Sequence, residues 1–221
     1  MENQRIDRLK PILLLLAAYG LAWIDLFLPQ PQIALFSSSW YVFSAAKSVL
    51  RFVFIAILTK AWFGSGASCL SFPSLFPQAK DVANGILIAA AAIAVALLFA
   101  FLALFSGARN PLLYPFGGSS RQPFSIFLMM LSSLGIGYSE ELFFRYFAVQ
   151  AFEKSGFSPS GAVLASALLF GASHGSQGIF GMISAAILAL LFSFFMMRGK
   201  SFHALALGHA LYDFAILLAV A

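Results

Sequence analysis

Long apolar blocks occupy most of this chain of 221 residues, and each is long enough to cross a membrane as a helix. Hydrocarbon about 30 Å thick needs roughly 17–25 residues of helix. Seven segments have this length and character: 11–28, 40–63, 82–105, 124–150, 157–174, 178–197 and 201–220. Pro, Gly and Ser collect in the connections between them. The sequence therefore predicts an all-α fold, a polytopic transmembrane helical bundle of about seven spans.

The composition excludes other classes of protein. Hydrophobic residues make up 61% of the chain, charged residues only 10%, and the mean hydropathy is +0.92. Soluble domains are about 45–50% apolar and about 25% charged, so a soluble enzyme, a disordered chain and a disulfide scaffold are all excluded. The single cysteine, Cys69, can form no internal disulfide. The net charge of +5 comes from bases scattered singly beside the apolar blocks. We interpret these bases as topology signals, and we expect no nucleic-acid partner.

Basic residues predict the orientation in the membrane. With a cytoplasmic N-terminus and an outside C-terminus, eight Lys or Arg lie inside and two lie outside. The inside residues are Arg5, Arg8, Lys10, Lys60, Lys80, Lys154, Arg198 and Lys200, and the outside residues are Arg109 and Arg121. We expect a multi-pass integral protein of a bacterial inner membrane. Lys47 and Arg51 stand in or beside the second span, where we predict that they snorkel outward.

Several ionisable residues stand inside the predicted spans: Glu140, Glu141, Arg145, His174, His203, His209 and Asp213. Each such group costs about 2.5–3.5 kcal/mol in hydrocarbon, so it usually faces the bundle interior and marks a site. So many of them predict a buried polar cavity. His203 is an exception, because it follows Arg198 and Lys200 closely, and we predict an interfacial position for it.

Helical spacing pairs some of these residues. Glu141 and Arg145 are i,i+4 partners and can neutralise each other, whereas Glu140 is rotated by about 100° and stays free to take a proton from water. An ion-pair network that only fixes helix packing is the structural alternative. His209 and Asp213 are also i,i+4, so the carboxylate can hold one imidazole nitrogen. The alternative there is a buried histidine that is merely satisfied by its neighbour.

The depth of His174 does not match that of the other residues. At about 1.5 Å per residue, Glu140 and His209 lie about 12 Å from the cytoplasmic boundary, and His174 about 24 Å if its helix starts at Pro159. Either this span begins outside the membrane, with Ser158 as N-cap and Pro159 at the first position, or residues 175–178 form a turn buried inside the protein. Small residues surround His174, and its structural alternative is a histidine bonded at a helix end.

Three short motifs in this region resemble those of the CPBP family, the membrane-embedded CAAX proteases and bacteriocin-processing enzymes also called the ABI family. Glu140-Glu141-Leu-Phe-Phe-Arg145 is similar to E-E-x-x-x-R, Phe170-Gly-Ala-Ser-His174 to F-x-x-x-H, and His209-Ala-Leu-Tyr-Asp213 to H-x-x-x-N/D. The motifs agree in order and spacing over residues 124–220. We therefore predict one integral membrane domain over 1–221, with variable N-terminal spans in 1–123 and a catalytic core in 124–220.

The resemblance implies an intramembrane endopeptidase in which Glu140 and His174 activate a water that attacks a peptide bond. His209 would bind or polarise the developing oxyanion together with Asp213. Many relatives carry Asn at the position of Asp213. An ionised Asp cannot donate to an oxyanion, so we expect Asp213 to orient His209. Glu141 and Arg145 would be structural and orienting residues.

We expect no cofactor, and a zinc site is the competing interpretation. Its ligands would be Glu140, His174 and His209, although no H-E-x-x-H helix is present. The expected partners are the lipid bilayer and a membrane-delivered peptide or protein: a prenylated tail, a bacteriocin leader or a sorting tag. The rival functions are a non-proteolytic immunity or scaffold protein of the same fold and a small proton- or cation-coupled transporter. The lack of a detectable inverted repeat disfavours the transporter.

Overall fold

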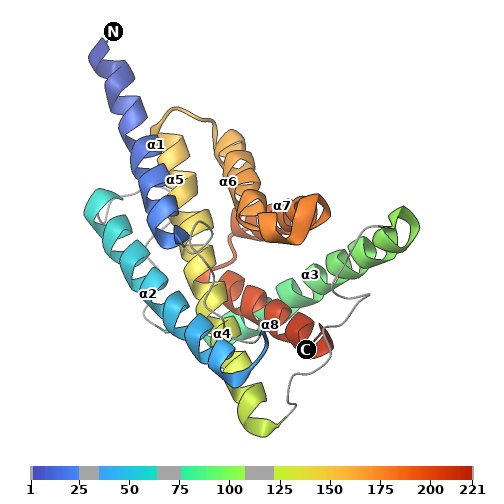
Figure 1. The fold of residues 1–221 in the computed structure, drawn as a ribbon. Coiled ribbons are helices and arrows are strands. Elements are labelled where there is room, and N and C mark those ends of the chain that lie inside the picture. Colours follow the sequence, from blue (N-terminus) through green and yellow to red (C-terminus); the bar gives the residue numbers. More distant parts are fainter. Residues whose placement is uncertain (1, 25–34, 64–75, 108–121, 221) are drawn as a thin grey trace.

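The structure, a computed structural model, describes residues 2–24, 35–63, 76–107 and 122–220. Every regular element in these ranges is helical, which confirms the predicted fold class (Figure 1). The helices are α1 (Glu2–Ala22), α2 (Ser38–Phe63), α3 (Ala79–Ser106), α4 (Pro123–Glu141), the π-helical η2 (Leu142–Ala148), α5 (Val149–Lys154), α6 (Pro159–Ser173), the short η3 (Gly175–Gln177), α7 (Gly178–Met197) and α8 (Phe202–Val220). Cys69, Arg109 and Arg121 lie outside the described residues.

Five of the described helices are long and apolar enough to cross a membrane: α2, α3, the continuous α4–η2–α5, α7 and α8. The protein is therefore an integral, multi-pass membrane protein. The predicted fifth span is the shorter helix α6, whose 15 residues reach only about 22 Å. As predicted, Ser158 caps it by accepting a hydrogen bond from the Gly161 N–H, and Pro159 takes the first position. Residues 175–178 are exposed, so the prediction of a turn buried in the protein is wrong.

The α4–η2–α5 rod runs through the middle of the molecule, and α2 and α8 pack along it (Figure 1). Glycine allows α8 to come close to this rod, because a Cβ at Gly137 would stand 2.6 Å from the Ala206 carbonyl oxygen. The opposite face of α8 packs against α3, where a Cβ at Gly208 would stand 2.7 Å from Ile88 Cγ2. The helix that carries His209 is therefore held between α3 and α4.

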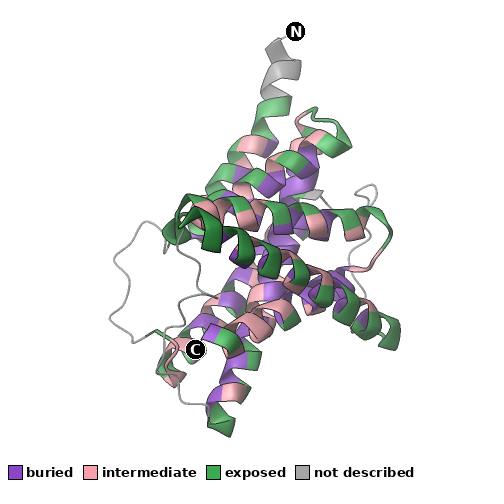
Figure 2. Cartoon of the chain, turned by 90° about the vertical axis from the view of Figure 1, so that its right-hand side faces the viewer, coloured by how far each residue is buried: buried purple, intermediate pink, exposed green. Residues whose placement is uncertain are grey.

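The deepest part of the fold is the second half of the α4–η2–α5 rod, where every residue from 139 to 151 is buried (Figure 2). Arg51 also turns inward, so the prediction that it snorkels is wrong. Its Nε donates a hydrogen bond to the Ala22 carbonyl, and its guanidinium lies 4.7 Å from the centre of the Trp23 ring. The last carbonyls of a helix lack intrahelical donors, and Arg51 supplies one at the end of α1.

Candidate active site

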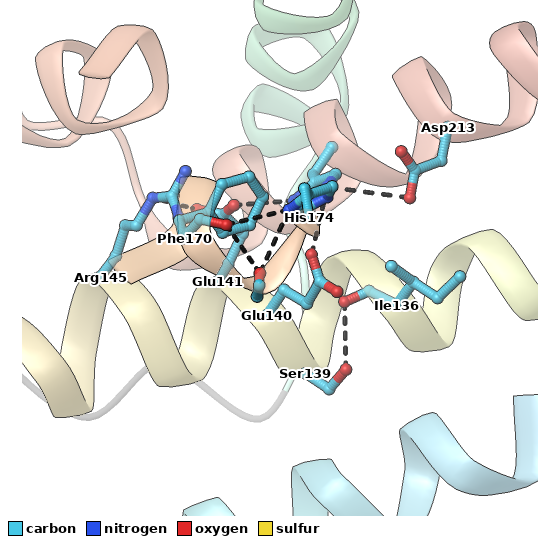
Figure 3. Close-up of polar contacts among 10 residues, drawn as sticks. Ile136, Ser139, Glu140, Glu141, Arg145, Phe170, His174 and Asp213 are labelled. Carbon is cyan, nitrogen blue, oxygen red and sulfur yellow. Dashed lines mark hydrogen bonds and ion pairs between the residues drawn. The ribbon is translucent and has the colours of Figure 1, made fainter. Parts of the chain in front are cut away.

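Three helices bring the predicted site residues together (Figure 3). Glu140 and Glu141 end α4, directly before η2. His174 is the residue that follows the last turn of α6, and His209 lies on α8. The small-residue contact at Gly137 brings α8 close to α4 one turn before the two glutamates. A single cavity therefore receives side chains from segments that are far apart in the sequence.

Glu141 is the carboxylate that binds most partners. Its Oε2 lies 3.1 Å from Arg145 Nε, which confirms the predicted i,i+4 ion pair, and its Oε1 lies 2.8 Å from His209 Nδ1. Glu141 is fully buried, and the Arg145 side chain is only 1% exposed. The guanidinium lies over the rings of Phe170 and Phe192, at 5.0 and 5.5 Å from their centres. Burying these two charges is tolerated because each faces the other.

The ring of His209 is held by Glu141 and not by Asp213. A carboxylate oxygen accepts, so the short contact at Nδ1 means that this nitrogen carries the proton it donates to Glu141. Asp213 Oδ2 lies 3.7 Å from Nε2, which confirms their proximity but is too long for a hydrogen bond. Glu140 Oε2 stands 3.8 Å from the same Nε2. The expected orienting hydrogen bond thus comes from another helix, and Nε2 faces two carboxylates.

The contacts of His174 define which of its ring nitrogens donates a hydrogen bond and which can accept one. Its Nδ1 lies 2.9 Å from the Phe170 carbonyl oxygen and 3.1 Å from Ser173 Oγ. A carbonyl can only accept, so Nδ1 carries a proton, and in the neutral ring Nε2 keeps a lone pair. The bond to Phe170 is the helix-end contact considered above, yet His174 also lines the cavity.

The cavity has a volume of about 340 Å³, and it confirms the predicted polar cavity in the bundle. Glu140, His174, His209 and Asp213 all line it. The rest of the wall is largely apolar and includes Trp40, Phe99, Phe180, Leu188 and Ile216. One region of the cavity can therefore polarise water while the remaining wall accepts apolar groups.

His203 does not line this cavity. Its side chain is buried at 6% exposure, and its Nδ1 lies 3.0 Å from the Tyr138 hydroxyl. His203 therefore packs inside the bundle, away from the proposed site, and its predicted depth at the membrane boundary stays a prediction. It is buried because α8 packs tightly against α3 and α4, which cover its first turn.

The sequence analysis did not predict three polar residues of the cavity wall. These are Gln177 of η3, Ser184 of α7 and Tyr212 of α8. Tyr212 precedes Asp213, so its place on α8 could have suggested it. Gln177 follows the end of α6, and no spacing rule points from it to the other site residues.

Comparison with protein families agrees with these motifs. Residues 122–215 match the family of Rce1-like proteins, described as type II CAAX prenyl endopeptidase Rce1-like. Searches of curated proteins and of solved structures returned no match. The matched segment begins just before α4, ends within α8 and contains all three motifs. The match confirms the resemblance to the CPBP intramembrane proteases over residues 122–215, which are less than half of the chain.

Proposed function

We propose that this protein is an intramembrane endopeptidase that cleaves peptide or protein tails with a water activated by Glu140 and His174. One observation carries the proposal: a cavity of about 340 Å³ collects Glu140, His174, His209 and Asp213 from three helices of the protease-like domain. A scaffold protein would not require two carboxylates and two imidazoles around one cavity. Their enclosure in a bundle interior favours chemistry, because buried ionisable groups are costly.

The proposed reaction begins with a water placed between Glu140 and His174. Glu140 takes one proton, and the His174 Nε2 lone pair accepts a hydrogen bond from the other. The water oxygen bonds to the carbonyl carbon of the scissile peptide, and the carbonyl oxygen becomes an oxyanion. The carbon–nitrogen bond then breaks, and Glu140 returns its proton to the leaving nitrogen. Water is consumed, and a carboxyl and an amino end are released.

His209 is the proposed oxyanion donor. Glu141 fixes its ring by accepting from Nδ1, which leaves Nε2 toward Glu140 and Asp213. A protonated Nε2 would donate a hydrogen bond to the oxyanion. The added positive charge would also offset part of the negative charge of Glu140, Glu141 and Asp213, which the guanidinium of Arg145 alone does not balance. Asp213 lies close enough to favour that proton electrostatically without holding the ring.

The proposed mechanism uses no zinc ion. Within the described residues, no group of three His, Cys, Asp or Glu side chains is arranged to hold a metal ion. His209 uses Nδ1 for Glu141, and its Nε2 is 3.7–3.8 Å from the two carboxylates it faces. We therefore derive no step through a metal.

The substrate proposed for this site is a peptide or protein segment delivered through the membrane. The apolar wall around Phe99, Phe180 and Leu188 offers contacts to an apolar chain or side chain next to the water-activating residues. A prenylated C-terminal tail, a bacteriocin leader and a sorting tag all present such a segment. The bilayer is the second expected partner.

Comparison of membrane proteomes tests the proposed function and names the substrate. Cells would carry the wild-type protein, Glu140→Gln, or Glu153→Gln, which changes a carboxylate on the same rod outside the cavity wall. General base catalysis contributes about 10²–10⁴-fold, so Glu140→Gln should let an uncleaved precursor accumulate while Glu153→Gln does not. A folded Glu140→Gln protein that processes every precursor at the wild-type rate would sink the proposal.

A further inference from the structure

A π-helical segment of seven residues, η2, follows the two glutamates directly. Such segments are rare, and most occur as single turns at functional sites. Every residue of η2 is buried, and Arg145 lies within it. Arg145 therefore stands on the π turn, four residues after Glu141, so a displacement of this turn would move its guanidinium.

Ser166 of α6 donates a hydrogen bond to the backbone of η2. Its Oγ lies 2.5 Å from the Phe144 carbonyl oxygen, and the two residues are 2% and 0% exposed. A buried carbonyl needs a donor, and the change from α to π hydrogen bonding interrupts the regular pattern of donors along the helix. Ser166 thus donates from a neighbouring helix to a buried carbonyl of the π turn.

The same hydrogen bond joins the two helices that carry the proposed water-activating pair. Ser166 lies on α6 and His174 directly follows that helix, whereas η2 continues the helix that carries Glu140. From η2 the polar contacts continue through Arg145 to Glu141 at 3.1 Å and from Glu141 to His209 at 2.8 Å. A displacement of the π turn would therefore reach the ring of His209.

We propose that Ser166 is a positioning residue whose hydrogen bond to Phe144 holds the π turn and, through Arg145 and Glu141, keeps His209 directed toward Glu140. The inference rests on the proposed function and adds a residue that touches neither substrate nor water. Without the hydroxyl, the Phe144 carbonyl loses this donor. The turn can then return to α hydrogen bonding, which rotates the residues before it relative to those after it.

Kinetics of Ser166 variants test this role on a synthetic peptide that spans the cleavage site found in the proteome comparison. A misplacement of about 1 Å can cost about 10²-fold, so Ser166→Ala should lower kcat about 10- to 100-fold. KM should stay unchanged because Ser166 does not line the cavity. Ser166→Thr keeps the hydroxyl and should recover most of kcat. Ser132→Ala is the matched control, because Ser132 is fully buried on α4 and its Oγ has no hydrogen-bond partner within the described residues.

Hydrogen exchange over residues 142–148 provides a readout that needs no substrate. Ser166→Ala should exchange faster in this segment than the wild type, and Ser132→Ala should not. The proposal is overturned if Ser166→Ala keeps the wild-type kcat, if both serine variants lose kcat equally, or if Thr recovers nothing. If Ser166→Ala exchanges faster but the wild-type protein cleaves no peptide, the hydrogen bond of Ser166 to the π turn is supported. The proposed function is then overturned instead.

Discussion

Among single residues, Glu141 shows most clearly what sequence spacing can and cannot predict. Its i,i+4 ion pair with Arg145 is predicted by α-helical spacing, and the structure confirms the pair although Arg145 lies in the π-helical η2. Its hydrogen bond to His209 joins positions 68 residues apart and depends on how α8 packs against α4. Spacing therefore suggested Asp213 as the partner that holds His209, because a single sequence shows neighbours on one helix and not contacts between helices.

The buried pair of Glu141 and Arg145 gives a prediction for stability. Arg145→Met leaves the fully buried Glu141 without its cation, which should lower the free energy of unfolding by about 3–5 kcal/mol. Adding Glu141→Gln should recover part of this loss, since the amide oxygen still accepts from His209 Nδ1. Thermal unfolding in detergent measures both effects, with the exposed Arg198→Met as the control. If Arg145→Met and wild type share one midpoint, the ion pair does not contribute as described.

At the scale of the helices, the apolar periodicity predicted the elements well but not their internal geometry. The predicted segment 82–105 corresponds to α3 (Ala79–Ser106) in the structure, and the predicted segment 178–197 corresponds to α7 (Gly178–Met197). The segment 124–150 suggested a uniform helix, yet it contains the π-helical Leu142–Ala148. Nothing in this run of large apolar residues predicts a π turn. The serine hydroxyl that donates to the Phe144 carbonyl lies on α6, in another part of the sequence.

The close approach of α4 and α8 predicts the effect of adding one methyl group. A Cβ at Gly137 would stand 2.6 Å from the Ala206 carbonyl oxygen and 2.8 Å from the Ala210 backbone nitrogen. Backbone atoms cannot rotate away, so Gly137→Ala should push α8 outward and carry His209 with it. Peptide cleavage should fall by about 10²-fold, the cost of a misplacement near 1 Å. Gly20→Ala is the control, because a Cβ there has nothing within 4 Å and should leave activity unchanged. Equal activity of both variants would contradict the tight contact.

For the molecule as a whole, metal content distinguishes the proposed reaction from Lewis-acid catalysis. If Glu140 and His174 activate water by themselves, a strong chelator should leave cleavage unchanged, and purified protein should lack stoichiometric metal. Elemental analysis before and after chelation measures this, with a zinc protease treated in parallel as the control. The contrary result would be one zinc per chain whose removal abolishes activity and whose return restores it. That result would favour Glu140, His174 and His209 as zinc ligands.

The orientation of the whole chain depends on whether the short helix α6 crosses the bilayer. Its 15 residues reach about 22 Å against about 30 Å of hydrocarbon, but a bilayer can thin around a short span at modest cost. Lys154 and Lys200 predict that the connections before α6 and after α7 are cytoplasmic, which places the exposed η3 turn between these two helices outside. In a Cys69→Ser background, a membrane-impermeant maleimide added to intact cells should label Ser176→Cys and Ala219→Cys. Lys154→Cys should react only after the cells are opened. If Ser176→Cys is protected in both preparations, α6 ends inside the bilayer and the predicted crossing is wrong.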